Sequence, residues 1–264
     1  MSDIKFVAEV SSNHNGDIDR CKQFIKSASE IGCDAVKFQL FKIEQLFAKE
    51  ILRNNVDLLK RKEWELPIEF IPELSACAHE YNLEFSCTPF YLDAVDELEK
   101  YVDFYKIASY ELLWQDLFKK CAKTGIPIVF STGMATLAEI QATLDSLVGE
   151  KSKKITVLHC NSAYPTKIKD ANLQAISNLR NRLSNFNNKL SLSFGWSDHT
   201  VSPAVMYRAI HHYQASFIEF HLDLDGKGKE FSSGHCWLPE QIGEVIENVK
   251  RGLLADGNGN IEAT

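Results

Sequence analysis

Residues 217–225 read FIEFHLDLD, and from Ile218 onward apolar and polar side chains alternate without a break. Successive side chains of a β-strand point to opposite faces, so a period of two indicates a strand with one apolar and one polar face. The polar face carries an imidazole and three carboxylates, from Glu219, His221, Asp223 and Asp225. Charged groups on a buried strand are costly unless they pair or hold a cation. The other strands should therefore supply partners for them.

Seven more segments of this kind precede it, and each is followed by a stretch with helical spacing of its apolar residues. The eight expected strand and helix pairs are 4–10 with 18–31, 34–41 with 68–81, 83–88 with 92–101, 104–109 with 113–123, 126–131 with 137–148, 155–160 with 172–183, 190–194 with 203–213, and 217–223 with 239–254. A long irregular stretch separates the second strand from its helix.

Regular alternation of strands and helices predicts a parallel sheet, and eight repeats favour a closed (β/α)8 TIM barrel. We expect a single α/β domain over residues 1–256 and a short C-terminal tail over 257–264. An open doubly wound sheet is the alternative. No GxGxxG follows the first strand and no GxxxxGK[ST] occurs, so that alternative lacks its nucleotide-binding signature.

The composition limits the kinds of molecule that this protein is expected to bind. The 264 residues are 45% hydrophobic, which allows a large core, and the formal net charge of −7 gives no basic field for nucleic acid. The seven cysteines form no CxxC pair, which is typical of reduced thiols in a cytoplasmic protein. No apolar stretch approaches the length of a membrane span, and the N-terminus lacks a secretory signal pattern. We expect a cytoplasmic protein that binds neither nucleic acid nor membrane.

Two lysines, Lys37 and Lys106, lie inside predicted strands, where a desolvated ammonium needs an anion. In a TIM barrel the active site lies at the carboxyl ends of the strands. Polar residues gather there in this chain, so the lysines could receive a phosphate or carboxylate ligand. The alternative is internal pairing of either lysine with Glu9 or Glu219.

Two histidines, His199 and His221, end the neighbouring strands seven and eight, and their imidazoles could converge on one divalent cation. Asp198, Glu219 and Asp223 lie close by in the sequence and strengthen that interpretation. A single histidine would more often be a satisfied core residue. His235 and Cys236 follow in the next loop, where they could add ligands. None of the cysteines has an adjacent base that would mark it as a nucleophile.

Motifs along nearly the whole chain make it resemble the sialic acid synthase family. They are SNHNGD at 12–17, AVKFQ at 35–39, TPF at 88–90, KIAS at 106–109, STGMAT at 131–136, HC at 159–160 with YP at 164–165, GWSDHT at 195–200, and EFH at 219–221. Members of this family condense phosphoenolpyruvate with an N-acylated amino sugar. Each motif alone is weak evidence for the family, but all of them together in the expected order are specific evidence.

The resemblance implies roles for particular residues. Those expected to bind the phosphate and carboxylate of phosphoenolpyruvate are Lys37, Thr88, Lys106, Ser109, Ser131 and Ser197. Those expected to contact the sugar or assist its chemistry are Asn15, Gln39, Glu111 and Tyr164. His199 and His221 are expected to hold a divalent metal, with manganese the usual ion and magnesium or cobalt as alternatives. Glu111, His221 and Lys106 form the expected catalytic set.

The chain departs from the family pattern in two places. Typical members continue into an antifreeze-like domain that reaches across a dimer, whereas this sequence stops soon after the eighth helix. A homodimer, or a partner that supplies that domain, is therefore expected. The loop after strand eight also lacks the usual Gly-Pro-Asp segment, and Glu230 or His235 is the candidate to replace that aspartate.

Two other functions remain open at this point. One is another condensation of phosphoenolpyruvate with an aldose, of the 3-deoxy-octulosonate or heptulosonate phosphate type. The other is a non-catalytic barrel that binds phosphoenolpyruvate or a sugar. The leading expectation is a metal-dependent nonulosonate synthase that releases phosphate.

Overall fold

Eight parallel strands close into a barrel in the computed structural model, which describes residues 4–184, 186 and 188–257. The barrel strands are β1 (Lys5–Glu9), β2 (Ala35–Leu40), β3 (Glu84–Pro89), β4 (Phe104–Ile107), β5 (Ile128–Ser131), β6 (Lys154–Cys160), β7 (Ser191–Asp198) and β8 (Phe217–Leu222). Each strand pairs with the next in sequence, and β1 pairs with β8 from Lys5↔Phe217 to Glu9↔His221. The predicted (β/α)8 barrel is therefore confirmed.

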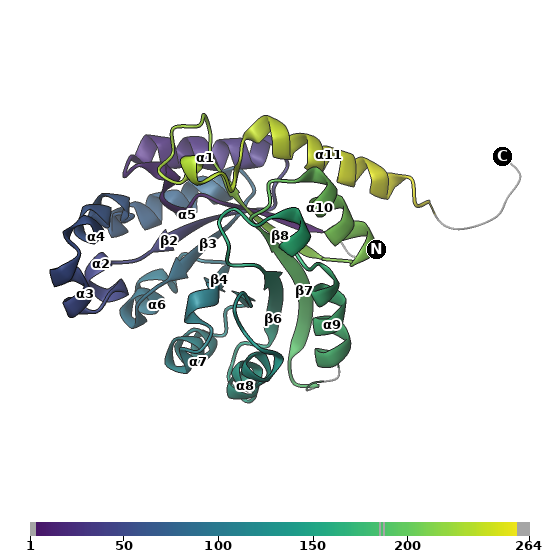
Figure 1. Cartoon of the computed structure of the whole chain (residues 1–264), viewed down its shortest axis with the longest axis horizontal. Helices are drawn as coiled ribbons and strands as arrows, with labels where there is room; N and C mark the ends of the chain where they lie inside the picture. Colours follow the sequence, from purple (N-terminus) through teal and green to yellow (C-terminus); the bar gives the residue numbers. More distant parts are fainter. Residues whose placement is uncertain (1–3, 185, 187, 258–264) are drawn as a thin grey trace, which may run out of the picture.

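Helices surround the ring of strands, as Figure 1 shows. They are α1 (Ile18–Glu30), α2 (Ile43–Leu46), α3 (Lys49–Asn54), α4 (Val56–Lys60), α5 (Ile71–Glu80), α6 (Leu92–Leu98), α7 (Gln115–Thr124), α8 (Leu137–Leu147), α9 (Gln174–Leu183), α10 (Pro203–Tyr207) and α11 (Pro239–Leu254). Helix boundaries follow ordinary capping chemistry. The Asp17 carboxylate accepts the first amides of α1, and Thr136 forms a capping box with Glu139 at α8.

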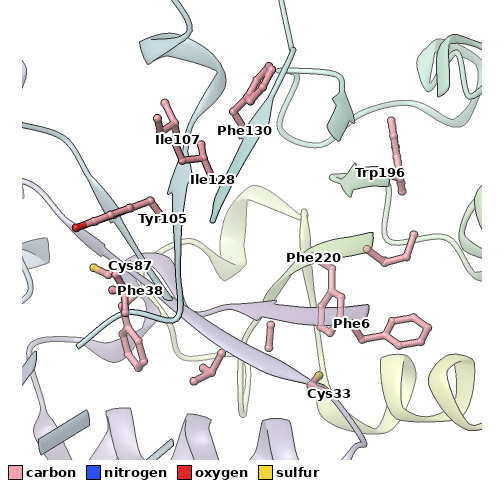
Figure 2. Packing of buried hydrophobic residues seen from close by; sticks show 14 of the residues in the cluster. Phe6, Cys33, Phe38, Cys87, Tyr105, Ile107, Ile128, Phe130, Trp196 and Phe220 are labelled. Atoms are coloured by element: carbon pink, nitrogen blue, oxygen red, sulfur yellow. The ribbon is translucent and has the colours of Figure 1, made fainter. Parts of the chain in front are cut away.

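The main hydrophobic core lies between the strands and the surrounding helices. Figure 2 shows part of it, including Tyr105 of β4, Phe130 of β5 and Trp196 of β7, all fully buried. A smaller apolar cluster is formed by one residue from each of six strands, five of which lie two positions before a polar residue and one, Leu158, two positions before Cys160; its members are Val7, Ala35, Phe104, Val129, Leu158 and Phe217. Because residues i and i+2 share a face of a strand, this cluster places the polar residues that follow it in the next layer of the barrel interior.

The stretch expected to be irregular contains the short helices α2, α3 and α4 and a 3-10 turn at Arg61–Trp64. Their apolar residues form a separate cluster around Phe41, Ile43 and Leu52. Such short helices depend on tertiary packing more than on intrinsic propensity, so periodicity did not reveal them. A further strand, β9 (Cys236–Trp237), also went unpredicted; it pairs with β8 at His221↔Cys236.

Several predicted boundaries shift. A 3-10 turn at Ile68–Phe70 precedes α5, and a π-helical turn at Arg208–His212 continues α10. The last residues of the predicted tail, 258–264, lie outside the described residues. Within the described part of the chain, no helix combines the length and apolar composition that crossing a membrane requires.

Strand β7, predicted to end at Phe194, continues through Gly195 to Asp198. A Cβ atom at Gly195 would lie 2.1 Å from the backbone oxygen of Phe217 and 2.7 Å from Leu158 Cδ2. The missing side chain therefore allows β7 and β8 to approach each other beneath the polar layer.

We predict that Gly195→Ala lowers the free energy of unfolding by about 1–3 kcal/mol or more, because neither strand can move without disturbing the closed barrel. Urea denaturation would measure this loss. Gly252→Ala in α11 is the matched control, because a Cβ there meets no atom of the described residues within 4 Å and alanine favours a helix. Equal stability of the two variants would contradict the prediction.

Candidate functional site at the carboxyl ends of the strands

The centre of the site is an ion-paired cluster of buried side chains from β1, β2, β4 and β8. Lys37 contacts the Glu9 carboxylate, lies 3.8 Å from Glu219 Oε2 and donates to Thr88 Oγ1 at 3.2 Å. Lys106 Nζ lies 3.3 Å from Glu219 Oε1, which also accepts a hydrogen bond from Ser197 Oγ at 2.9 Å. The internal pairing that the sequence left open is thus present for both lysines.

Electrostatics keep Lys37 and Glu219 of this cluster charged at neutral pH. Burial lowers the pKa of Lys37 to about 8, so its ammonium stays protonated near pH 7. Burial by itself would raise the pKa of Glu219, but Lys106 and Lys37 outweigh it and bring the pKa to about 2. The two ammonium groups and the two carboxylates therefore compensate one another inside the barrel.

Unpartnered polar atoms lie next to this cluster. Among the described residues, buried side-chain oxygens without a hydrogen-bond partner include Ser131 Oγ, Ser162 Oγ, Glu111 Oε2 and Glu219 Oε2. Buried polar groups normally have partners, so several such atoms in one place indicate room for a polar ligand.

A narrow cradle is formed by Ser109, Gly133 and Ser162, which lie in the loops after β4, β5 and β6. The Gly133 amide donates to Ser109 Oγ at 3.0 Å, and a Cβ at Gly133 would lie 2.2 Å from Ser162 Oγ. Because Gly133 has no side chain, Ser109 and Ser162 lie directly against its backbone. This arrangement is suited to hydroxyl and amide contacts with an anion. Ser162 was not predicted as a site residue; it lies two positions after Cys160 at the end of β6, and that spacing was the available signal.

Glu111 ends a 3-10 turn at Ser109–Glu111 that follows β4. Burial raises the pKa of its carboxyl to about 7, which the nearby Lys106 only partly opposes. A carboxyl with a pKa near neutrality can both donate and accept a proton, which suits the role expected for Glu111.

Three imidazoles meet beside the lysine cluster. The ring centroids of His199 and His221 are 5.3 Å apart, and His235 lies 4.6 Å from His221 and 6.2 Å from His199. His199 Nδ1 is 2.7 Å from the Asn161 carbonyl oxygen, which leaves Nε2 as the nitrogen available to a ligand. Burial lowers the pKa of His199 to about 3, with a further contribution from His221, so its ring is neutral.

The predicted pair His199 and His221 is thus brought together, and the structure adds His235 and Glu230 to it. His221, Glu230, His235 and Cys236 each place one potential metal-binding atom within 4.8 Å of those of the others. Neutral imidazoles and a carboxylate suit a divalent transition-metal ion. The residues present therefore fit the predicted metal; the sequence had offered His235 as a possible added ligand, and Glu230 only as a candidate for a missing aspartate.

Asp198 and Asp223, expected beside the metal, do not belong to this group. The Asp198 carboxylate accepts the indole N–H groups of Trp196 and Trp237 at 3.1 and 2.9 Å, and Asp223 pairs with Arg20 at 2.9 Å. Asp198 follows the inward-facing Ser197, so the pleat turns it to the other face of β7. Asp223 lies beyond the end of β8, where the alternation no longer fixes its direction.

The predicted sugar-contacting residues lie around the mouth. Tyr164, in the loop after β6, places its ring 4.1 Å from His199 and 4.8 Å from His235, centroid to centroid. Gln39 is aligned with Thr88 on the neighbouring strand, two residues beyond Lys37 on the same face. Asn15 is exposed, with a left-handed backbone at φ 55°, and donates to the Lys227 carbonyl at 3.5 Å.

Comparison with known proteins places this barrel in context. The model of the NeuB family matches residues 24–261. N,N'-diacetyllegionaminic acid synthase of Campylobacter jejuni is 34% identical over 272 residues, which cover 98% of this chain and 79% of that protein. Pseudaminic acid synthase of Helicobacter pylori is 31% identical, with 96% of this chain and 75% of that protein covered.

Solved structures agree with the sequence relatives. The N-acetylneuraminic acid synthetase of Leptospira borgpetersenii, determined with citrate, superposes with a TM-score of 0.86 at 25% identity and covers 100% of this chain and 88% of that chain. A truncated 3-deoxy-D-arabino-heptulosonate 7-phosphate synthase of Thermotoga maritima has a TM-score of 0.69 at 14% identity, which shows a shared fold alone. The match to the family model over most of the chain establishes that this protein is a member of the NeuB family.

Proposed function

We propose that this chain is a synthase that condenses phosphoenolpyruvate with an N-acylated amino sugar of the N-acetylmannosamine type to give a nonulosonate and inorganic phosphate. The observation that carries the proposal is the juxtaposition of two buried lysines with a three-imidazole cluster at the mouth of the barrel. The named synthases among its relatives support the same reaction class.

In this proposal phosphoenolpyruvate lies over the lysine cluster. Lys37 and Lys106 offset its negative charge, and Ser131, Ser162 and the cradle at Ser109 supply hydroxyl donors without adding charge. Thr88 and Ser197 already bond to members of the cluster, so they hold it in shape around the ligand. Fixed donors of this kind orient the substrate and stabilise charge that develops during reaction.

The proposed divalent metal, with manganese preferred over magnesium or cobalt, would be held by His199 and His221. When bound, such an ion supplies Lewis-acid polarisation of the sugar aldehyde oxygen and can activate water. Tyr164 packs against the His199 ring and, with Asn15 and Gln39 near the rim, is placed to contact the sugar.

The proposed chemistry balances as follows. C3 of phosphoenolpyruvate forms a bond to the aldehyde carbon of the open-chain sugar, and Glu111 in its protonated form donates a proton to the aldehyde oxygen. Water adds at C2 and loses both its protons over the step: one restores the Glu111 carboxyl, and the other leaves with the phosphate as the bond between C2 and the bridging oxygen breaks. The product keeps a 2-oxo acid at one end, and the sum is one phosphoenolpyruvate, one sugar and one water giving one nonulosonate and one phosphate.

Phosphate release from phosphoenolpyruvate, measured with N-acetylmannosamine and related amino sugars, tests the proposal. We expect release that depends on both the sugar and manganese. Release only with a phosphorylated aldose would identify an octulosonate- or heptulosonate-type synthase instead. Binding of phosphoenolpyruvate, seen as a raised melting temperature without any product, would identify a non-catalytic barrel.

His221→Ala should lower kcat/KM by at least about 100-fold, the scale on which loss of one transition-state electrostatic contact is felt. His211→Ala is the matched control, because His211 is exposed in the π-helical turn after α10 and should retain the wild-type rate. Steady-state assays with and without manganese measure both. Metal-dependent turnover that survives in His221→Ala would remove this imidazole from the proposed site.

Glu111→Gln tests the raised pKa of this carboxyl through stability. The folded pKa of about 7 lies above the unfolded value of about 4.3, so folding favours the protonated carboxyl. The free energy of unfolding that this carboxyl contributes is fully present below about pH 4.3 and is lost as pH rises through 7. Glutamine mimics the neutral form at every pH.

The melting temperature of Glu111→Gln relative to wild type should therefore be nearly unchanged at pH 4 and higher by a few degrees at pH 8. The exposed Glu244→Gln in α11 serves as control, with a difference that does not grow between these values. A difference for Glu111→Gln that stays constant with pH would show that the carboxyl is not held protonated. Activity of the same variant should fall by about 100-fold or more, as expected for loss of a general acid.

A further inference from the structure

His235 is buried, and its ring has no hydrogen-bond partner in the part of the chain that the structure describes. Its side chain is about 5% exposed, and neither Nδ1 nor Nε2 makes a hydrogen bond to a described residue. Nε2 lies 3.5 Å from Glu230 Oε2, longer than a normal hydrogen bond. A buried imidazole with two unsatisfied nitrogens costs free energy unless something absent from the polypeptide completes it.

The pairing of β9 with β8 sets the position of the His235 imidazole. Its neighbour Cys236 pairs with His221 in the β8–β9 ladder, so His235 arrives next to the end of β8. The next residue, Trp237, is buried and donates its indole N–H to Asp198 at 2.9 Å. Asp198, which lies outside the candidate metal site, links β9 to β7 through this hydrogen bond. The link fixes the backbone position from which His235 projects.

The spacing of the three rings suits a single ion. Imidazole nitrogens bind zinc-like ions at about 2.0–2.1 Å, which sets two ring centroids roughly 4.5 Å apart for ligands at right angles and roughly 6.5 Å apart for opposite ligands. The observed separations of 4.6, 5.3 and 6.2 Å fall within these limits, with His221 between the other two.

The Glu230 carboxylate is held in place through Oε1, the oxygen that does not face the histidines. Ser11 Oγ donates to Glu230 Oε1 at 2.7 Å, and the Glu230 amide donates to Asn13 Oδ1 at 2.8 Å. Oε2 is thereby directed to His221 Nδ1, 3.2 Å away. A carboxylate that accepts from one ring nitrogen fixes the other nitrogen toward a metal, so Glu230 acts on the ion through His221.

We propose that His235 is a third imidazole ligand of the divalent ion and that Glu230 is the positioning residue for His221. The inference deepens the metal site of the proposed function and rests on His199 and His221 being its first two ligands. Cys236 is excluded from the set because its sulfur accepts the Asn13 side-chain amide at 3.5 Å. The ligands are therefore nitrogen atoms from three imidazoles, one of them supplied by the loop after β8.

Titration of the metal-free protein with Co²⁺, followed by visible absorption, tests this assignment without using activity. His235→Ala and His235→Gln should each weaken Co²⁺ binding by at least the roughly 10- to 100-fold that loss of a supporting contact costs. Both should also change the shape of the d–d bands. Glu230→Gln should weaken binding while keeping the wild-type band shape, and His211→Ala should change neither.

Melting temperatures without metal check that each variant is folded. Wild-type affinity and band shape in both His235 variants would overturn the third ligand, while loss of binding in His199→Ala and His221→Ala would leave the two-histidine site of the proposed function standing. A changed band shape in Glu230→Gln would overturn its positioning role. Three-histidine Co²⁺ binding without any phosphate release would count against the proposed function alone.

Discussion

The barrel interior must hold four charges, and their mutual compensation governs the rest of the site. Val7, Ala35, Phe104 and Phe217 fill one layer, and two residues later the same strands present Glu9, Lys37, Lys106 and Glu219. The pleat makes this arrangement unavoidable once the apolar layer forms. Removing any one of the four would leave a net uncompensated charge in the buried cluster, which costs far more than a surface pair contributes.

The loop after β8 depends on a second set of charges outside the barrel. Arg20 in α1 bonds the Asn13 carbonyl at 2.7 Å and the carboxylates of Asp223 and Asp225 at 2.9 Å. Gly228 lies so close to Asn13 and Asp223 that a Cβ would approach them within 2.5 Å. The chain is thus pinned on both sides of residues 224–227, and Glu230 enters the site from a fixed backbone.

Much of this could be read from the sequence because it follows from alternation. The inward direction of Lys37, Lys106, Glu219 and His221 is set by strand parity, and the eight repeats imply the closed barrel. Parity fails beyond a strand end, which is why Asp223 was misplaced, and Asp198 was grouped with the histidines by proximity in sequence although parity turns it away.

Other features depend on tertiary contacts that no local pattern encodes. The short helices after β2 form over a cluster around Phe41 and Ile43, and β9 is only two residues long. His235 could be named as a candidate from its place in the loop. Its proximity to His221 depends on the pairing of β9 with β8, which carries too few residues to leave a period in the sequence.

Internal neutrality explains how such a barrel can fold around charged groups and still accommodate the anion of the proposed function. If the lysines had no carboxylate partners, their desolvation would oppose folding. With partners, each ammonium still has three N–H donors to distribute, and a ligand anion can share them. The hydroxyls of Ser131 and Ser162, which have no hydrogen-bond partner among the described residues, would add neutral donors for the anion of the proposed function without disturbing the charge balance on which folding depends. Folding and the proposed ligand binding therefore make different demands on the same cluster, and the uncharged serines would allow it to meet both.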